Sequence, residues 1–196
     1  MKEGLWMVRT KEFDEDAVLL KGMLLFWDQG FEKTSIQELV SHMGVHKGSM
    51  YDTFGDKKSL YIQALKRYSG RLEQSYKLRI AGLSAKEAIR MLFERAIHPG
   101  EESPMGCFIV NTAVELAKHD SEARECVHQS WDYTEQLIRD LIIEGQQSGE
   151  LSKTLNAEWL SQYFNNALIG LRVMVKTITD REKLRQIIEM NMSVLK

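Results

Sequence analysis

The sequence predicts an all-α protein of about nine helices, and this prediction rests on three features. The 196 residues contain only two prolines, Pro99 and Pro104, which flank one short loop, so few positions would break a helix. Apolar residues recur at spacings of three and four along most of the chain, and no stretch shows the alternation typical of a strand. A content of 43% hydrophobic and 28% charged residues is ordinary for a folded protein and excludes a disordered chain.

The expected helices follow one another along the chain and are joined by short loops. The first ends at Gly30, which supplies a left-handed stop, and the second begins after Thr34. The helix expected over residues 105–118 is apolar nearly all round, which predicts that it is completely buried. The expected helices span residues 14–29, 35–43, 46–53, 57–80, 85–97, 105–118, 121–147, 156–177 and 180–195.

Residues 31–60 show the pattern of a helix-turn-helix. Ser35 and Glu38 have the capping-box spacing, in which the serine hydroxyl and the glutamate carboxylate satisfy free backbone N–H groups reciprocally. Gly44 ends this helix, and a short helix that is polar on its outer side follows. Such a helix can enter the DNA major groove and place its first residues against base edges. The outward candidates are His46, Lys47, Ser49 and, further along, Asp52, while Gly48 leaves room for close backbone approach.

Two packed helices with a glycine turn also occur in many all-α proteins, so a purely structural helix pair is the alternative. The wider pattern is more specific. It reads Phe26-x-x-x-Gly30-Phe31-x-x-Thr34-Ser35-Ile36, then Gly44-Val45-His46-Lys47-Gly48-Ser49-Met50-Tyr51-x-x-Phe54, then Asp56-Lys57-x-x-Leu60. This pattern resembles the N-terminal DNA-binding domain of the tetracycline-repressor (TetR) family of transcriptional regulators, and the strong match covers residues 18–61. The resemblance implies a helix-turn-helix domain over residues 1–56 and a helical ligand-binding and dimerisation domain over residues 57–196.

The resemblance also implies contacts with DNA. In members of this family the positions of Thr34, Tyr51 and Lys57 usually touch phosphates. Each residue type suits that task, as a hydroxyl beside free amides, a donor on a stiff arm and a point charge. His46 stands where many members have serine, so it caps its helix less well but could reach a base or a phosphate. The full set of expected DNA contacts is Arg9, Thr34, Ser35, His46, Lys47, Gly48, Ser49, Tyr51 and Lys57.

Net charge alone does not favour a nucleic-acid partner. The 26 Lys and Arg residues face 28 Asp and Glu residues, a net charge of −2, and residues 1–61 have eight against ten, which is also −2. The acids cluster in residues 12–16, at the start of the first helix, where they suit its dipole. We therefore expect modest non-specific affinity with a strong salt dependence. The basic residues expected to face DNA are Arg9, Lys11, Lys47, Lys57 and Lys58.

The last two helices are expected to form a homodimer. A single recognition helix reads few base pairs, so a two-fold dimer on a palindromic double-stranded operator is the usual solution. The resemblance implies that the two helices of each subunit together make a four-helix interface. The alternative is that these faces pack within one subunit. The residues concerned are Trp159, Tyr163, Asn166, Gly170 and Val173, followed by Leu184, Ile187, Ile188, Met192 and Leu195.

The resemblance further implies a pocket for an unidentified small-molecule effector between the middle helices. Aromatic and methionine side chains with a few polar groups suit a small apolar or amphipathic ligand, although ordinary core packing explains most of them equally well. Asn111 is the most pointed candidate, because an amide in an apolar helix needs a partner. Ligand binding there would tilt the helix over residues 57–80 and change the spacing of the two recognition helices. The candidates are Tyr68, Met91, Met105, Cys107, Phe108, Asn111, Trp131, Tyr133, Phe164 and Asn165.

Cysteine usage predicts a cytoplasmic protein, because Cys107 and Cys126 are too few for a disulfide framework. Residues 1–13 hold no apolar core of signal-peptide length, and the longest apolar stretch, residues 105–114, is about half a membrane span, so no membrane partner is expected. A thiol near a helix N-terminus would suit oxidant or electrophile sensing by Cys107, whereas its apolar flanks favour an inert buried thiol.

An enzyme is the remaining alternative. Glu125-x-x-His128 has the spacing used by di-iron helical bundles, but such bundles need two of these motifs and further inward carboxylates. No glycine-rich phosphate loop, nucleophile elbow or zinc-ligand spacing occurs. The sequence therefore predicts no catalytic residue, no metal and no cofactor.

Overall fold

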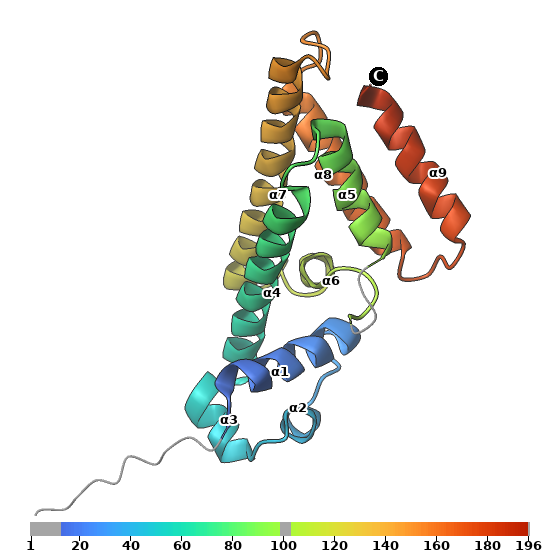
Figure 1. The fold of residues 1–196 in the computed structure, drawn as a ribbon. Helices are drawn as coiled ribbons and strands as arrows, with labels where there is room; N and C mark the ends of the chain where they lie inside the picture. The colour runs from blue at the N-terminus through green and yellow to red at the C-terminus, as the bar shows by residue number, and fades with distance from the viewer. Residues whose placement is uncertain (1–12, 99–102, 196) are drawn as a thin grey trace, which may run out of the picture.

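A computed structural model describes residues 13–98 and 103–195, and within these ranges it contains nine α-helices and no strand (Figure 1). The all-α prediction is confirmed. The first three helices gather at one end of the molecule, and α4 and α7 run side by side toward the other end. The helices are α1 (Glu15–Gln29), α2 (Ile36–Met43), α3 (Lys47–Phe54), α4 (Lys57–Ile80), α5 (Ala85–Ile97), α6 (Phe108–Glu115), α7 (Ser121–Ser148), α8 (Ala157–Met174) and α9 (Arg181–Met192), followed by the 3-10 turn η1 (Ser193–Leu195).

Local capping explains where the helices of the DNA-binding end start and stop. The predicted capping box is present, because Ser35 Oγ accepts the Glu38 N–H at 3.2 Å and the Glu38 carboxylate accepts the Ser35 N–H at 2.8 Å. Gly44 ends α2 in the left-handed conformation, with φ 73°. Gly30 also has a positive φ, 88°, but its ψ of 173° is extended, so the predicted left-handed stop is wrong in detail. Any Cβ at Gly30 would lie 2.8 Å from the carboxylate of Glu115.

The sequence prediction fails most clearly at α6. The helix is only Phe108–Glu115, much shorter than expected, because Gly106 has φ 93° and Cys107 is extended. It is not completely buried either, since Val114 is 81% exposed. The last two helices also end earlier than expected, at Met174 and at Met192.

Two hydrophobic clusters form the interior. The first joins α1, α2, α3 and the near part of α4 to α6 and the start of α7, and the rings of Phe26 and Phe108 pack edge-on against Tyr61 at 4.9 and 5.0 Å. The second joins the far part of α4 to α5, α7, α8 and α9, with Phe93 against Phe164. Because the first cluster runs from α1 into α6 and α7, the DNA-binding end packs directly on the remainder of the chain.

Candidate nucleic-acid interface and effector cavity

α3 presents one polar face to solvent. Met50 and Phe54 are buried in the first cluster, which turns the opposite side of the helix outward. The side chain of Tyr51 is 40% exposed to solvent, and Ser49 is half-buried. This short helix therefore has the outer face that a recognition helix needs. The exposed residues are His46, Lys47, Gly48, Tyr51 and Asp52.

Packing gives no reason for a glycine at position 48. A Cβ built on Gly48 meets no atom within 4 Å, and Gly48 is not among the glycines with positive φ. Its place in the exposed first turn of α3 lets the surface of a second molecule approach the backbone. His46 is the N-cap residue of α3 and makes no side-chain capping bond, as expected, so its exposed imidazole is free to contact another molecule.

Two lysines lie over aromatic rings beside this face. The Lys47 amino group is 6.0 Å from the centroid of the Tyr51 ring, and the Lys57 amino group is 4.3 Å from that of Phe31. Lys57 is the first residue of α4, where a cation opposes the helix dipole. This placement favours an anionic partner outside the helix.

One predicted DNA contact, and one further basic residue that was expected to face DNA, lie differently in the structure. Thr34 is fully buried, and its hydroxyl donates to the Gly30 carbonyl at 2.6 Å, so it is not the surface donor that was expected. Lys58 pairs with Asp120 at 2.5 Å, and this hydrogen bond holds the pKa of Asp120 below its usual range. The expected contact through Arg9 lies outside the described residues. Ser35 remains exposed while it caps α2.

Comparisons with known proteins agree with this geometry. The chain matches the family description "Bacterial regulatory proteins, tetR family" over residues 19–64 and "Tetracyclin repressor-like, C-terminal domain" over residues 85–190. It is 31% identical over 193 residues to the HTH-type transcriptional regulator YezE of Bacillus subtilis (strain 168), covering 96% of this chain and 100% of YezE. The chain belongs to the TetR family.

Two further known proteins also match most of the chain. The HTH-type transcriptional repressor ComR of Escherichia coli (strain K12) is 26% identical over 183 residues, covering 91% of this chain and 87% of ComR. A cysteine mutant of the TetR regulator CifR, solved with 26bp double-strand operator DNA, is 26% identical with a TM-score of 0.86, covering 96% of this chain and 100% of CifR. This TetR-family chain is thus a DNA-binding transcriptional regulator, and the family, one of regulators, confirms the prediction that it is not an enzyme.

Two further structural findings concern the alternatives raised by the sequence. Within residues 13–98 and 103–195, no group of three or more His, Cys, Asp or Glu side chains has a metal-binding arrangement, and Glu125 and His128 are both exposed on α7. No helix of the same ranges is long and apolar enough to cross a bilayer.

In this TetR-family chain, α6 ties the DNA-binding end to the remainder. The Glu115 carboxylate accepts the N–H groups of Phe31 at 3.0 Å and Glu32 at 2.9 Å, both in the loop between α1 and α2. The Asn111 amide donates to the Trp27 carbonyl at 3.1 Å and accepts from Lys176 at 3.0 Å. The amide of Asn111 therefore has the partner that its position in an apolar helix requires.

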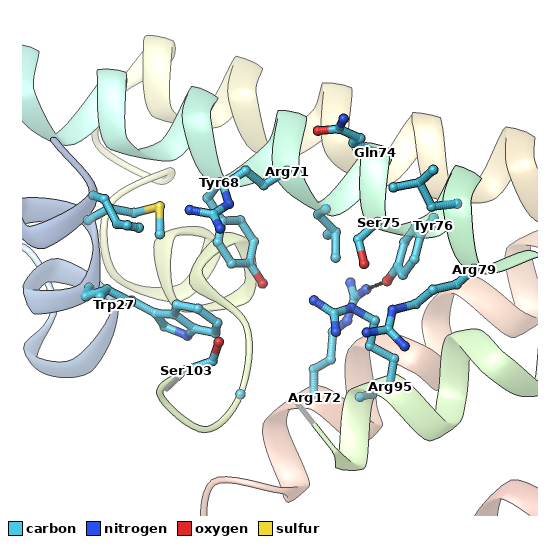
Figure 2. A pocket seen from close by; sticks show the side chains of 17 residues that line it. Trp27, Tyr68, Arg71, Gln74, Ser75, Tyr76, Arg79, Arg95, Ser103 and Arg172 are labelled. Carbon is cyan, nitrogen blue, oxygen red and sulfur yellow. Dashed lines mark hydrogen bonds between the residues drawn. The ribbon is translucent and has the colours of Figure 1, made fainter. Parts of the chain in front are cut away.

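The main cavity of the TetR-family chain lies between α1, α4, α5 and α8 and has a volume of about 640 Å³ (Figure 2). Arg172, which lines the cavity, is only 5% exposed, and its guanidinium donates a hydrogen bond to the Tyr76 hydroxyl. An arginine within the apolar run of residues 167–175 is the sequence signal for this site, and the sequence analysis did not use it. The lining residues are Leu20, Met23, Leu24, Trp27, Tyr68, Arg71, Leu72, Gln74, Ser75, Tyr76, Leu78, Arg79, Arg95, Ala96, Ser103, Gly106 and Arg172.

Of the expected effector-binding residues, only Tyr68 lines this cavity. Met105 is half-exposed outside it, and Cys107, Phe108 and Phe164 are buried in the two clusters. Cys107 accepts a hydrogen bond from the Tyr68 hydroxyl at 3.4 Å, and its proposed sensing role stays a prediction.

The other expected effector residues also lie away from the main cavity. Asn111 faces a smaller hollow of about 380 Å³ instead, and the Asn165 amide donates to the Trp131 carbonyl at 3.4 Å. Met91 and Tyr133 are half-buried against the second cluster. These residues do not line the main cavity because the aromatic and Met residues of the middle helices form core packing, whereas the cavity opens beside polar residues of α4.

The two helix faces that were expected to form the dimer differ in their exposure. On α8 the whole predicted face is exposed, with Trp159 72% and Val173 49% exposed. On α9 the predicted residues are buried or partly buried inside the subunit and the helix packs against α5, and the part of α9 in a dimer stays a prediction. The exposed apolar residues of the last segment are Met190 and Val194 instead.

Proposed function

We propose that this regulator is a ligand-responsive repressor that binds a palindromic operator as a homodimer. Residues 1–56 read DNA, and residues 57–196 bind an unidentified small-molecule effector and dimerise. The observation that carries the proposal is the outward face of α3, with Lys47 and Gly48 at its start and Tyr51 a turn further on. A cytoplasmic location stays a prediction.

Relatives support the DNA half of the proposal. CifR was solved on a double-strand operator, and ComR is named a transcriptional repressor. By analogy, two α3 helices of a dimer would enter successive major grooves roughly 34–36 Å apart. Base contacts from Lys47 and Ser49 would choose the sequence, and phosphate contacts from Tyr51 and Lys57 would fix the register.

The exposed face of α8 supports the dimer. An indole exposed to 72% in a folded regulator leaves a large apolar area in water unless a second molecule covers it. Trp159, Tyr163 and Val173 share this face with Gly170, where a Cβ would meet nothing within 4 Å, so the backbone of a second helix can approach closely. Met190 on α9 and Val194 in η1 are further exposed apolar residues of the last segment.

The position of the main cavity supports ligand control. Its walls come from α1, which packs on α2 in the DNA-binding end, and from α4, which follows α3 directly. A ligand that fits the cavity better in one arrangement of α1 and α4 shifts the population toward that arrangement. We propose that, in the arrangement that the ligand favours, the distance between the two α3 helices of the dimer no longer matches the spacing of the operator's major grooves.

Selection of genomic fragments by the purified full-length protein tests this function. We expect enriched fragments to share a palindrome and to be shifted by a dimer in a gel-mobility assay. Fragments without a common two-fold motif, or binding by a monomer, would overturn the proposal. Lys47→Ala should change which fragments are enriched, whereas an exposed lysine away from α3, such as Lys153→Ala, should not.

A further inference from the structure

Among the described residues, the charged side chains that line the main cavity all have the same sign. They are four arginines: Arg71 and Arg79 on α4, Arg95 on α5 and Arg172 on α8. No aspartate or glutamate of residues 13–98 and 103–195 is among the lining residues. Cations gathered around one cavity repel one another, and an anion bound between them relieves that repulsion.

Arg172 is the most deeply buried of these cations. Within the described part of the chain, its one hydrogen bond goes to the hydroxyl of Tyr76, although a guanidinium has five N–H donors. Tyr76 does not neutralise the charge, because burial raises the pKa of its phenol and keeps it protonated at neutral pH. A buried cation without a carboxylate partner is costly. On this otherwise apolar part of α8, none of the described residues supplies the anion that Arg172 would pair with, which favours an anionic ligand.

The unpartnered buried groups of the cavity are donors as well. Within the described ranges, neither the indole N–H of Trp27 nor the Nε–H of Arg95 has a hydrogen-bond acceptor, and both residues line the cavity. Buried donors are normally satisfied, so their presence here favours a ligand rich in acceptor atoms.

The two ends of the cavity differ in character. In Figure 2, Arg79, Arg95 and Arg172 gather at one end beside Tyr76, whereas Trp27 of α1 lies at the other end and Arg71 lies beside Tyr68, apart from the other arginines. Leu20, Met23 and Leu24 of α1 add apolar surface to that second end. The cavity is therefore amphipathic, with three of its four lining arginines at the end toward α5 and α8 and more apolar surface at the end toward α1.

We infer that this cavity binds an amphipathic organic anion, a carboxylate or similar oxyanion on an apolar body, with Arg172 and Arg95 at its head. This inference rests on the proposed function, in which the cavity takes the effector, and it names the effector's chemical class. A guanidinium can hold a carboxylate through two parallel hydrogen bonds, which selects an anion over an isosteric neutral molecule. The apolar body of the ligand then lies against α1, so binding can change how α1 packs within the DNA-binding end.

Calorimetric titration of the full-length protein tests the anion preference directly, with decanoate and phenylbutyrate as probes and decanol as the neutral counterpart. We expect decanoate to bind more tightly than decanol by about tenfold or more, since hydrogen bonds to charged groups are the strong ones. Binding should also change tryptophan fluorescence, because Trp27 lines the cavity. Equal affinity for decanoate and decanol, or no binding of either carboxylate, would overturn the inference.

Arginine variants locate the site. Arg172→Met should abolish the preference for decanoate over decanol, and Arg79→Gln, at an exposed position where folding is not at risk, should weaken decanoate binding several-fold without changing decanol binding. Arg185→Gln on the exposed side of α9 removes the same charge outside the cavity and should change neither. Decanoate binding that survives unchanged in Arg79→Gln and in a folded Arg172→Met would refute the site.

The same samples separate this inference from the function on which it rests. Protein that selects a palindromic fragment but shows no anion preference refutes the anion inference alone. Protein that binds decanoate through these arginines but selects no genomic fragment refutes the proposed repressor instead. Both ideas are supported if decanoate weakens the complex with the selected fragment and Arg79→Gln needs more decanoate for the same effect.

Discussion

Individual side chains at the DNA-binding end divide into those that hold the fold and those that are free to meet another molecule. Thr34 and Lys58 belong to the first kind, because each already has a partner within the chain. The second kind includes Lys47, Tyr51 and Lys57. The amino groups of the two lysines lie over the rings of Tyr51 and Phe31, and none of the three residues has an ion pair among the described residues. The sequence placed both Lys57 and Lys58 among the basic residues expected to face DNA, and the position of Asp120 across the fold shows that Lys58 already has a partner.

This separation predicts the salt dependence of DNA binding. Lys57→Ala should weaken binding to all DNA sequences alike and reduce the slope of log affinity against log salt by about 1, because one phosphate contact is lost. Lys58→Ala is the matched control and should leave the slope unchanged, since Lys58 is paired with Asp120. Gel-shift titrations at several salt concentrations measure both. An unchanged slope for Lys57→Ala would remove this lysine from the phosphate contacts.

The start of α3 is predicted to set base preference rather than overall affinity. Lys47→Ala and Ser49→Ala should each change the preferred base at one position of each half-site, by about 1–3 kcal/mol of discrimination. Selection from a randomised operator library measures the preference directly. If both variants prefer the same bases as the unaltered protein, α3 is not the recognition helix.

Buried Thr34 is predicted to matter for stability and not for phosphate binding. Thr34→Val keeps the size of the side chain but leaves the Gly30 carbonyl without its hydroxyl donor, which should lower the free energy of unfolding by about 1 kcal/mol. The salt slope of DNA binding should not change. Denaturant unfolding and the gel-shift series together check this prediction, and a smaller slope would restore Thr34 as a phosphate contact.

Among the elements, helix boundaries were predictable wherever the signal is local. Ser35 with Glu38, and Gly44 after Met43, define α2 through contacts within a few residues, and these are the contacts seen. α6 was not predictable in the same way, because its start depends on Gly106, which packs beside Lys176 and α8 far along the chain. The proposed effector cavity was missed for a related reason, because its arginines come from three different helices and meet only when the fold assembles.

α6 is predicted to hold the loop between α1 and α2 through one carboxylate. Glu115→Ala leaves the N–H groups of Phe31 and Glu32 without their acceptor, which should lower the free energy of unfolding by about 1–3 kcal/mol and speed hydrogen exchange of this loop. Glu122→Ala, which removes an exposed partner of Lys66, is the control and should do neither. Exchange in the loop as slow as in the unaltered protein would show that Glu115 does not anchor it.

At the scale of the whole molecule, the DNA-binding segment could be identified from sequence because its signature lies within residues 18–61. The dimer interface could not, because only the folded structure shows which helix faces stay exposed. The helical spacing of α9 gives an apolar stripe that suits a dimer interface and a monomer core equally, and packing on α5 decides for the core. On α8 the opposite holds, because the inner face carries Phe164 and Leu168 while a second apolar face remains outside.

The outer face of α8 therefore carries the last prediction, which concerns the quaternary structure. Trp159→Asp places a charge within the proposed interface, where it would be buried without a partner, and should convert the dimer to a monomer in sedimentation velocity. Leu83→Asp, at an exposed apolar residue of the α4–α5 loop, is the control and should stay dimeric. A monomer holds one half-site only, so operator affinity should fall far more than either lysine variant lowers it, while far-UV circular dichroism stays unchanged. A Trp159→Asp protein that remains dimeric would move the interface away from α8, and the spacing of the two recognition helices would then follow from a different face of the molecule.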